Sequence, residues 1–329
     1  MTQIVLLYRM KMDGRNSIEG VFSPLDALPN IHRMELPCDL NFIKNVFKLL
    51  WFALNIKEKN IHITGDIHYM AIFLFWKKII ITVHDCNHYE DLTGLRKKLM
   101  GYVWYTLPLR IADQITVISP FAKEQLCGNF NFDYKKIVVI PNSFHPIKKD
   151  GNTKKEGKFT ILSVGSNPIK NRKRLIEAVK DLPDVQLFLI GKLSEELTRL
   201  LETYKIAYKN DYHINRQELE KYYNRADVLF FASIKEGFGL PILEAQSCGL
   251  PVITSNTTSM PYVAGDGACI VDPYNVGAIK GALLKIKDDL NYRQKITKQG
   301  FENIKRFGEM NFVKNFKSLY NTVFNLTAL

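Results

Sequence analysis

Two carboxylates eight positions apart, Glu236 and Glu244, are the side chains of this 329-residue chain whose types and spacing best suit chemistry. They flank a glycine loop, EGFG, in which Gly237 and Gly239 carry no side chain that would keep a ligand from the backbone. Pro241 fits the first turn of a following helix, and a helix N-terminus attracts phosphate. Acids beside a phosphate need another role, such as hydrogen bonding to sugar hydroxyls. Spacing alone also allows a structural interpretation, in which Glu244 complements the helix dipole and Glu236 is a solvated loop acid.

The loop joins two expected strands. Residues 228–233 (VLFFAS) are a continuous apolar run of strand length, which is typical of a parallel sheet covered on both faces. The helix that begins near Pro241 is expected to end at Gly249, and residues 251–256 are again strand-like. The pattern therefore predicts a site for phosphate and sugar at the carboxyl end of a buried strand.

Residues 236–256, EGFGLPILEAQSCGLPVITSN, resemble the donor-site signature of family 4 glycosyltransferases, the acid–seven–acid motif of retaining GT-B enzymes. The resemblance implies an α/β fold of two Rossmann-like, doubly wound parallel-sheet domains that face a central cleft. It implies an enzyme that moves a sugar from a nucleotide-diphosphate donor (a UDP- or GDP-sugar) to an acceptor hydroxyl, with retention of configuration. Polysaccharide or cell-envelope glycan biosynthesis is the expected setting, and a glycan or a lipid-linked molecule the expected acceptor.

The same resemblance assigns roles to individual residues. Glu236 is expected to contact the donor sugar and stabilise its oxocarbenium-like state, and Glu244 to hold the ribose hydroxyls. His84, at the end of the strand-like run 78–85, is expected to face the transferred sugar. Independently of the resemblance, the His84–Asp85 pair also allows a purely structural interpretation, in which Asp85 caps the next helix, and we expect Asp85 to be structural. No metal ion and no cofactor beyond the donor are implied. The other donor-binding positions expected are Gly165, Gly237, Phe238, Gly239 and Leu240.

A basic segment, residues 164–178, follows the first strand of the second half. Lys170 matches the lysine with which the family contacts the diphosphate. The arginine that usually precedes this lysine is absent, and Arg172 is a candidate to replace it. The alternative interpretation is a solvated basic helix start.

Strand-like and helical runs alternate through both halves, which favours a doubly wound sheet in each. The charged stretch 145–158 reads as a linker between them. The resemblance implies that residues 1–150 form the acceptor-side domain and residues 151–308 the donor domain, and that a terminal helix, 309–326, packs back on the first domain. The twelve expected strands are 3–9, 31–37, 61–66, 78–85, 114–119, 136–142, 158–166, 185–192, 206–210, 228–233, 251–256 and 268–272.

The acceptor side is less defined. The paired glycines usual after the first strand are replaced by the separated Gly14 and Gly20, with Asn16 between them. Residues 62–69, HITGDIHY, resemble a segment near the acceptor cleft of some family members. No chemistry follows from it, and loop residues that satisfy backbone groups are an equal interpretation.

A net charge of +12 favours anionic partners, and no nucleic-acid-binding motif is present. Residues 41–59 and 94–110 interleave basic with apolar residues, Lys44 and Lys48 among them. Such segments suit either peripheral contact with an anionic membrane or a core-facing helix with a wet basic face. Five cysteines without close pairing indicate reduced thiols. The expected location is the cytoplasm or the inner face of the plasma membrane.

Three alternatives follow from the same residues. A GT-B sugar-nucleotide epimerase would bind the same donor without an acceptor, and a non-catalytic subunit would bind it without turnover. A glycosidase is disfavoured, because its two acids would leave the phosphate-binding helix end unused.

Overall fold

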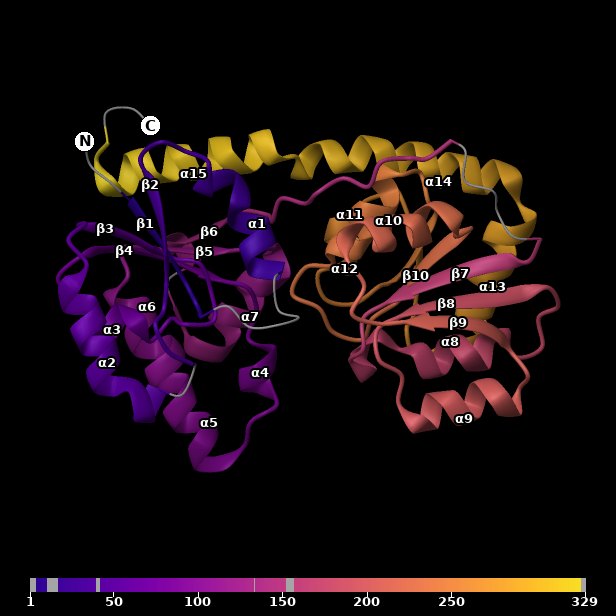
Figure 1. Cartoon of the computed structure of the whole chain (residues 1–329), viewed down its shortest axis with the longest axis horizontal. Helices are drawn as coiled ribbons and strands as arrows, with labels where there is room; N and C mark the ends of the chain where they lie inside the picture. Colours follow the sequence, from indigo (N-terminus) through magenta and orange to yellow (C-terminus); the bar gives the residue numbers. More distant parts are fainter. Residues whose placement is uncertain (1–3, 11–16, 40–41, 133, 152–156, 327–329) are drawn as a thin grey trace. The chain divides into compact units, whose positions relative to one another are not determined.

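The computed structural model describes residues 4–10, 17–39, 42–132, 134–151 and 157–326. The chain divides into two compact units, the first Met1–Ser143 with Phe307–Leu329 and the second Phe144–Arg306. The division falls slightly before the stretch expected as the linker. Each unit holds one six-stranded sheet (Figure 1). All strand pairs are parallel, as the alternating pattern predicted.

The first unit has the strand order β2-β1-β3-β4-β5-β6. Its central strands are buried along their whole length, because helices cover both faces of the sheet. The strands coincide with the first six expected runs: β1 Ile4–Tyr8, β2 Ile31–Glu35, β3 Asn60–Ile63, β4 Lys78–Val83, β5 Gln114–Val117 and β6 Ile137–Val139.

Most helices of the first unit follow a strand and return the chain to the start of the next strand. The helices are α1 Ser17–Asp26, α2 Phe42–Asn55, α3 Met70–Phe73, α4 Asn87–Glu90, α5 Gly94–Met100, the π-helical turn Gly101–Thr106, α6 Leu107–Ile111, α7 Pro120–Phe130, the 3₁₀ turn Tyr134–Lys136 and, from the end of the chain, α15 Glu309–Phe324.

The terminal helix α15 packs on the first unit through an aromatic stripe. Phe312, Phe316 and Tyr320 recur every four residues and are buried. The Phe22 ring of α1 meets the Phe312 and Phe316 rings at centroid distances of 5.6 and 5.7 Å. The helices α1 and α15 are thus far apart in the sequence, but both belong to the first unit.

His62 of β3 is the polar centre of this packing. Its Nδ1 lies 2.7 Å from the Tyr320 hydroxyl and its Nε2 lies 2.7 Å from Thr82 Oγ1. The ring is fully buried, and this burial lowers the pKa of His62 to about 3. His62, from the segment HITGDIHY, is therefore a neutral core residue that holds α15.

The second unit has the strand order β12-β11-β10-β7-β8-β9. Its strands again coincide with the expected runs: β7 Phe159–Val164, β8 Val185–Ile190, β9 Ala207–Asp211, β10 Val228–Phe231, β11 Val252–Ser255 and β12 Cys269–Val271. Apolar residues of β7, β8 and β10 share one core with those of the flanking helices.

Several helices of the second unit begin at a side-chain cap. Asn215, for example, forms a reciprocal capping box with Glu218 at the start of α10. The helices are the 3₁₀ turn Pro168–Lys170, α8 Arg172–Val179, α9 Glu195–Thr203, α10 Arg216–Arg225, α11 Leu240–Ser247, α12 Met260–Ala264, α13 Val276–Asp288, α14 Leu290–Asn303 and the 3₁₀ turn Ile304–Phe307, which ends at the first residue of the returning segment.

We expect acid to destabilise the protein through His62. The unfolded ring takes up a proton near pH 6.5, as an unperturbed histidine does, whereas the folded ring does so near pH 3. The unfolded state thus binds more protons between these values, and stability falls as the pH falls. At pH 5 the loss is about 2 kcal/mol. Urea unfolding at pH 7 and pH 5 measures it. His62→Gln should reduce the difference between the two pH values, and an unchanged difference would contradict this origin.

Candidate functional site

The second sheet reverses its winding direction between β7 and β10. From β7 the chain winds outward through β8 and β9, and from β10 it winds the other way through β11 and β12. β7 and β10 pair in parallel, with Val228 opposite Ile161 and Leu229 opposite Leu162. The loops after these two strands therefore leave one edge of the sheet in opposite directions. In open α/β sheets, ligands bind outside the carboxyl ends of the strands at such a reversal.

Lys170 and Glu236 meet at this edge. Their side chains come from the loops after β7 and β10, and Lys170 Nζ lies 2.5 Å from Glu236 Oε1. The two side chains retain 17% and 16% of their exposure, so the pair is partly shielded yet reachable by a ligand. Lys170 Nζ also lies 4.5 Å from the centroid of the Phe231 ring at the end of β10.

Gly165 makes room for the Lys170 side chain. Its φ is +110°, a left-handed value that favours glycine, and a Cβ at this position would stand 2.6 Å from Lys170 Cε. Gly165 thus acts through the position of Lys170, at the end of β7.

The glycine loop 236–239 leads directly into α11, as predicted. Gly239 has φ +117° and is the N-cap of the helix, and a Cβ on it would stand 2.9 Å from Met260 Cε. Ser259 Oγ lies 3.0 Å from the Glu236 carbonyl oxygen and 2.8 Å from that of Phe238, so its hydroxyl holds the loop from the next connection along the sheet. Gly237 and Phe238 are buried and Leu240 opens the helix. The first turn of α11 is thereby fixed next to Glu236.

Glu244, one turn into α11, is held by two protein donors. Arg216 Nη1 lies 2.5 Å from Oε1, and the Tyr223 hydroxyl donates to Oε2 at 2.7 Å. Burial, and then the Glu244 carboxylate, raise the pKa of Tyr223 well above its ordinary value, which keeps the phenol a donor. Each carboxylate oxygen accepts more than one hydrogen bond, so Glu244 retains acceptor capacity.

Arg172, the candidate to replace the family arginine, is engaged with the backbone of its own sheet. Its guanidinium is buried and donates to the carbonyl oxygens of Ser163 (3.0 Å) and Ile190 (2.6 Å) at the ends of β7 and β8. Burial lowers the pKa of Arg172 to about 10. Its donors bind the backbone, and we therefore leave Arg172 out of the donor site.

In the first unit, His84 follows β4, as expected. Its Nε2 lies 2.7 Å from the Thr64 carbonyl oxygen. A carbonyl only accepts, so Nε2 carries a proton. Gly65 lies against the ring, where a Cβ would stand 2.6 Å from His84 Cδ2. Asp85 accepts from the Asn87 N–H at 2.9 Å, which is the structural role predicted for it.

Several polar partners in both units were not predicted from the sequence. Arg216 and Tyr223 lie on α10, far along the chain from Glu244, and the capping box at Asn215 was the only local signal near them. In the first unit Arg9, buried after β1, bonds Glu19 at 3.3 Å and Asp66 at 2.6 Å. Of the residues considered for the acceptor side, Gly14 and Asn16 lie outside the described residues.

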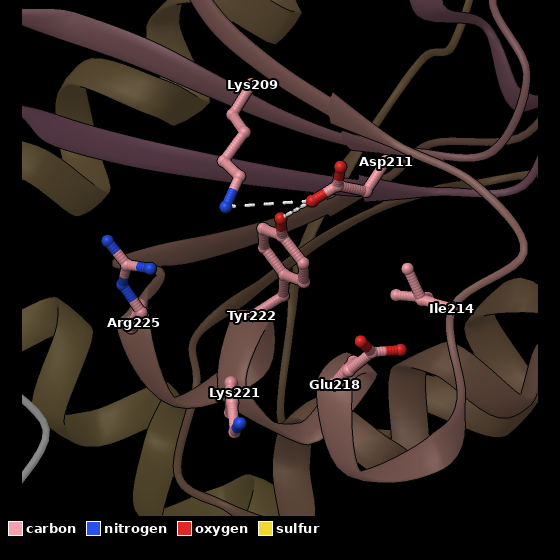
Figure 2. Close-up of a pocket in the computed structure, with 7 residues that line it drawn as sticks. All are labelled: Lys209, Asp211, Ile214, Glu218, Lys221, Tyr222 and Arg225. Atoms are coloured by element: carbon pink, nitrogen blue, oxygen red, sulfur yellow. Dashed lines mark hydrogen bonds and ion pairs between the residues drawn. The ribbon is translucent and has the colours of Figure 1, made fainter.

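A separate polar pocket of about 280 Å³ lies between β9 and α10 (Figure 2). The Tyr222 hydroxyl bonds the Asp211 carboxylate there, and Lys209 Nζ lies 3.6 Å from the same oxygen. None of the predicted site residues lines it. The full lining is Lys209, Asp211, Ile214, Glu218, Lys221, Tyr222 and Arg225. Among the described residues, no group of three or more His, Cys, Asp and Glu side chains is arranged to hold a metal ion.

Known structures share this architecture over almost the whole chain. A glycosyltransferase from Rickettsia africae aligns with a TM-score of 0.76 at 16% identity, covering 99% of this chain and 100% of that one. Anabaena HepE in complex with UDP-glucose aligns with a TM-score of 0.80 at 14% identity, covering 97% and 99%. Two Rossmann-like parallel-sheet domains, together with these neighbours, define the GT-B fold.

Family models match nearly the whole described chain. Residues 12–146 match Glycosyltransferase Family 4, and residues 145–303 match Glycosyl transferases group 1. Among similar curated proteins, the O-antigen chain mannosyltransferase B of Escherichia coli is 28% identical over 70% of this chain and 67% of that protein. RfbU of Salmonella typhimurium, an O-antigen chain mannosyltransferase, is 27% identical over 78% and 75%. The chain belongs to the family 4 glycosyltransferases and is a glycosyltransferase, which disfavours the epimerase and the non-catalytic subunit.

If Glu244 holds a donor ribose, Tyr223→Phe should weaken the binding of a nucleoside diphosphate. The substitution removes one of the donors that fix the carboxylate, and we expect a loss of about fivefold in affinity, or about 1 kcal/mol. Calorimetric titration with UDP and GDP measures it. Tyr222→Phe is the matched control, because the neighbouring tyrosine also bonds a carboxylate but faces the other pocket. Equal losses in both variants, or none in either, would contradict the role.

Proposed function

We propose that this enzyme transfers a sugar from a nucleoside-diphosphate donor to an acceptor hydroxyl with retention of anomeric configuration. The observation that carries the proposal is the pair of Lys170 and Glu236 at the reversal of the second sheet, beside the N-terminus of α11. At this point a lysine ammonium, which suits a diphosphate, is in direct contact with a carboxylate, which suits the hydroxyls of a sugar. A donor that carries both groups uses both partners.

On donor binding, Lys170 exchanges part of its contact with Glu236 for the diphosphate. Its ammonium and the positive end of α11 offset the charge that develops on the leaving group as the bond between the sugar C1 and the phosphate oxygen breaks. In this proposal, protein groups stabilise the charge on the leaving group, as in the metal-independent enzyme that the resemblance implies. The positions that bring the backbone close to the donor are Gly165, Gly237, Phe238, Gly239 and Leu240.

Glu236 then faces the donor sugar, where its carboxylate stabilises positive charge at C1. The acceptor oxygen forms the new bond to C1 on the same face, and its proton passes to the departing phosphate oxygen. This step needs no protein base. Glu244 holds the ribose hydroxyls with the acceptor capacity left by Arg216 and Tyr223. His84 contacts the transferred sugar through Nδ1, the ring nitrogen that does not face Thr64.

The relatives support a hexose donor and a glycan product. The two curated proteins are named for mannose transfer to the O-antigen chain. HepE was solved with UDP-glucose. We therefore propose a UDP- or GDP-hexose as donor and a glycan or lipid-linked acceptor in polysaccharide or cell-envelope biosynthesis.

A panel of nucleotides tests the donor class. We expect one of UDP and GDP to raise the melting temperature, and its sugar conjugate (UDP-glucose or GDP-mannose) to raise it further, because only ligands that bind the folded state stabilise it. ADP and CMP serve as controls. NMR of the product anomer then tests retention. Equal shifts with all the nucleotides, or an inverted product, would contradict the proposal.

Glu236→Gln tests the role of the carboxylate. We expect turnover to fall by about 100-fold or more, as for the loss of other groups that stabilise transition-state charge, while the affinity for the nucleoside diphosphate stays within a few-fold. Glu196→Gln is the matched control. It disrupts another Lys–Glu pair of the same unit, with Lys173 Nζ 2.7 Å from Glu196 Oε1, on the exposed surface. Unchanged turnover in Glu236→Gln would remove this residue from the mechanism.

A further inference from the structure

Helix α2 exposes an apolar stripe that the rest of the described chain leaves uncovered. Its residues recur at helical spacing, i, i+3, i+4 and i+7, and therefore share one face. They are Phe47, Leu50, Trp51 and Leu54, with exposed fractions of 87%, 40%, 69% and 64%. We call these four residues the α2 stripe.

The opposite face of the helix already supplies the contact with the core. Leu49 and Ala53 are fully buried. The α2 stripe is thus additional to the packing of the unit, and α2 lies at the periphery of that unit (Figure 1). Single exposed apolar residues are ordinary in soluble proteins, whereas a contiguous exposed patch marks a contact surface.

Positive charge borders the stripe. Lys44 precedes Phe47 by three positions and Lys48 precedes Trp51 by three, so both lie along one side of it, and both are exposed. α2 contains no acidic residue. The surface therefore combines large aromatic side chains with lysines and carries no carboxylate of its own helix.

A second helix of the same unit repeats the pattern. Leu95, Leu99 and Tyr102 recur every three or four residues across α5 and the π-helical turn, with exposed fractions of 80%, 59% and 55%. Arg96 and Lys98 between them are exposed, and α5 has no acidic residue. Two separate helices of one unit thus expose apolar side chains next to basic ones, and neither helix uses these side chains to pack on the unit.

We propose that the α2 stripe docks this enzyme on the surface of an anionic lipid bilayer, with α2 lying in the interface and α5 as a second contact. Trp and Phe rings suit the boundary between headgroups and acyl chains, and lysines suit anionic headgroups. In the described part of the chain no helix has the length and apolar composition to cross a bilayer.

A second copy of the chain fits this surface less well. An isologous dimer through α2 would place Lys44 and Lys48 of both copies at one interface, with no acid on the helix to compensate. An anionic bilayer meets the same lysines with opposite charge. Charge thus favours the lipid surface.

The inference rests on the proposed function in one respect, since a lipid-linked acceptor gives the docking its purpose. The test is kept independent of activity. Co-sedimentation of the full chain is measured with phosphatidylcholine vesicles and with vesicles that also contain phosphatidylglycerol, without donor or acceptor. We expect binding to the anionic vesicles only, lost as salt rises. Failure here leaves the transferase proposal intact, and an inactive enzyme leaves vesicle binding intact.

Two variants separate the apolar and charged contributions. Phe47→Ser/Trp51→Ser should reduce the vesicle partition coefficient about tenfold or more by removing the inserted rings. Lys44→Glu/Lys48→Glu should reduce it by a similar factor, because each basic residue near the surface contributes to the attraction. The control is Leu290→Ser/Met310→Ser, two apolar residues with exposed fractions of 53% and 88% outside both helices. It should bind vesicles as the native chain does.

Three results would overturn the proposal. One is the absence of binding to anionic vesicles, and another is equal binding by the native chain and the Phe47→Ser/Trp51→Ser variant. The third is a dimer, seen by light scattering without lipid, that this variant converts to a monomer, which would assign the stripe to a second copy. All the substituted side chains are exposed, and unchanged melting temperatures verify that the variants fold.

Discussion

The candidate donor site depends on the parallel pairing of β7 with β10. Adjacent parallel strands end at the same edge of a sheet, so the loops that follow them begin side by side although they are far apart in sequence. Lys170 and Glu236, separated by 66 positions, meet only for this reason. The opposite winding on either side of the pair keeps the space between the two loops free of a connecting helix. Gly165 and Gly239 then allow side chain and backbone to approach there without a Cβ in the way.

Charge compensation is the second condition that the site satisfies. Each acid of the acid–seven–acid motif has a base from another element, Lys170 for Glu236 and Arg216 for Glu244. A partly buried carboxylate without such a partner would be costly, because it loses its hydration. The consequence is a site that is stable when empty and in which Lys170 can exchange one anion for another. Tyr223 adds a neutral donor that orients Glu244 without adding charge.

His62 and the α2 stripe both depart from the usual distribution of residues, and they do so for different reasons. His62 is a fully buried polar ring, which is tolerated because Tyr320 and Thr82 satisfy both of its nitrogens. Trp51 and its neighbours on α2 are large apolar side chains in solvent, and no described residue covers them. The first departure is resolved within the fold and tethers α15. The second calls for a partner outside the fold, and the lysines beside it define the charge of that partner.

The sequence by itself determined the strands, the winding and the motif, because strand-length apolar runs, glycine turns and capping residues are local signals. The acid–seven–acid spacing likewise placed Glu236 at the loop and Glu244 on the helix. Only the tertiary structure determined which residues, far apart in the sequence, contact one another. Arg172 looked like a phosphate ligand beside Lys170, yet a turn of backbone directs it to carbonyl oxygens of β7 and β8. Arg216 and Tyr223 reach Glu244 from a helix that no local pattern connects to it. α2 is apolar on more than one face, so only packing against the sheet could select which face is buried and which is left to solvent.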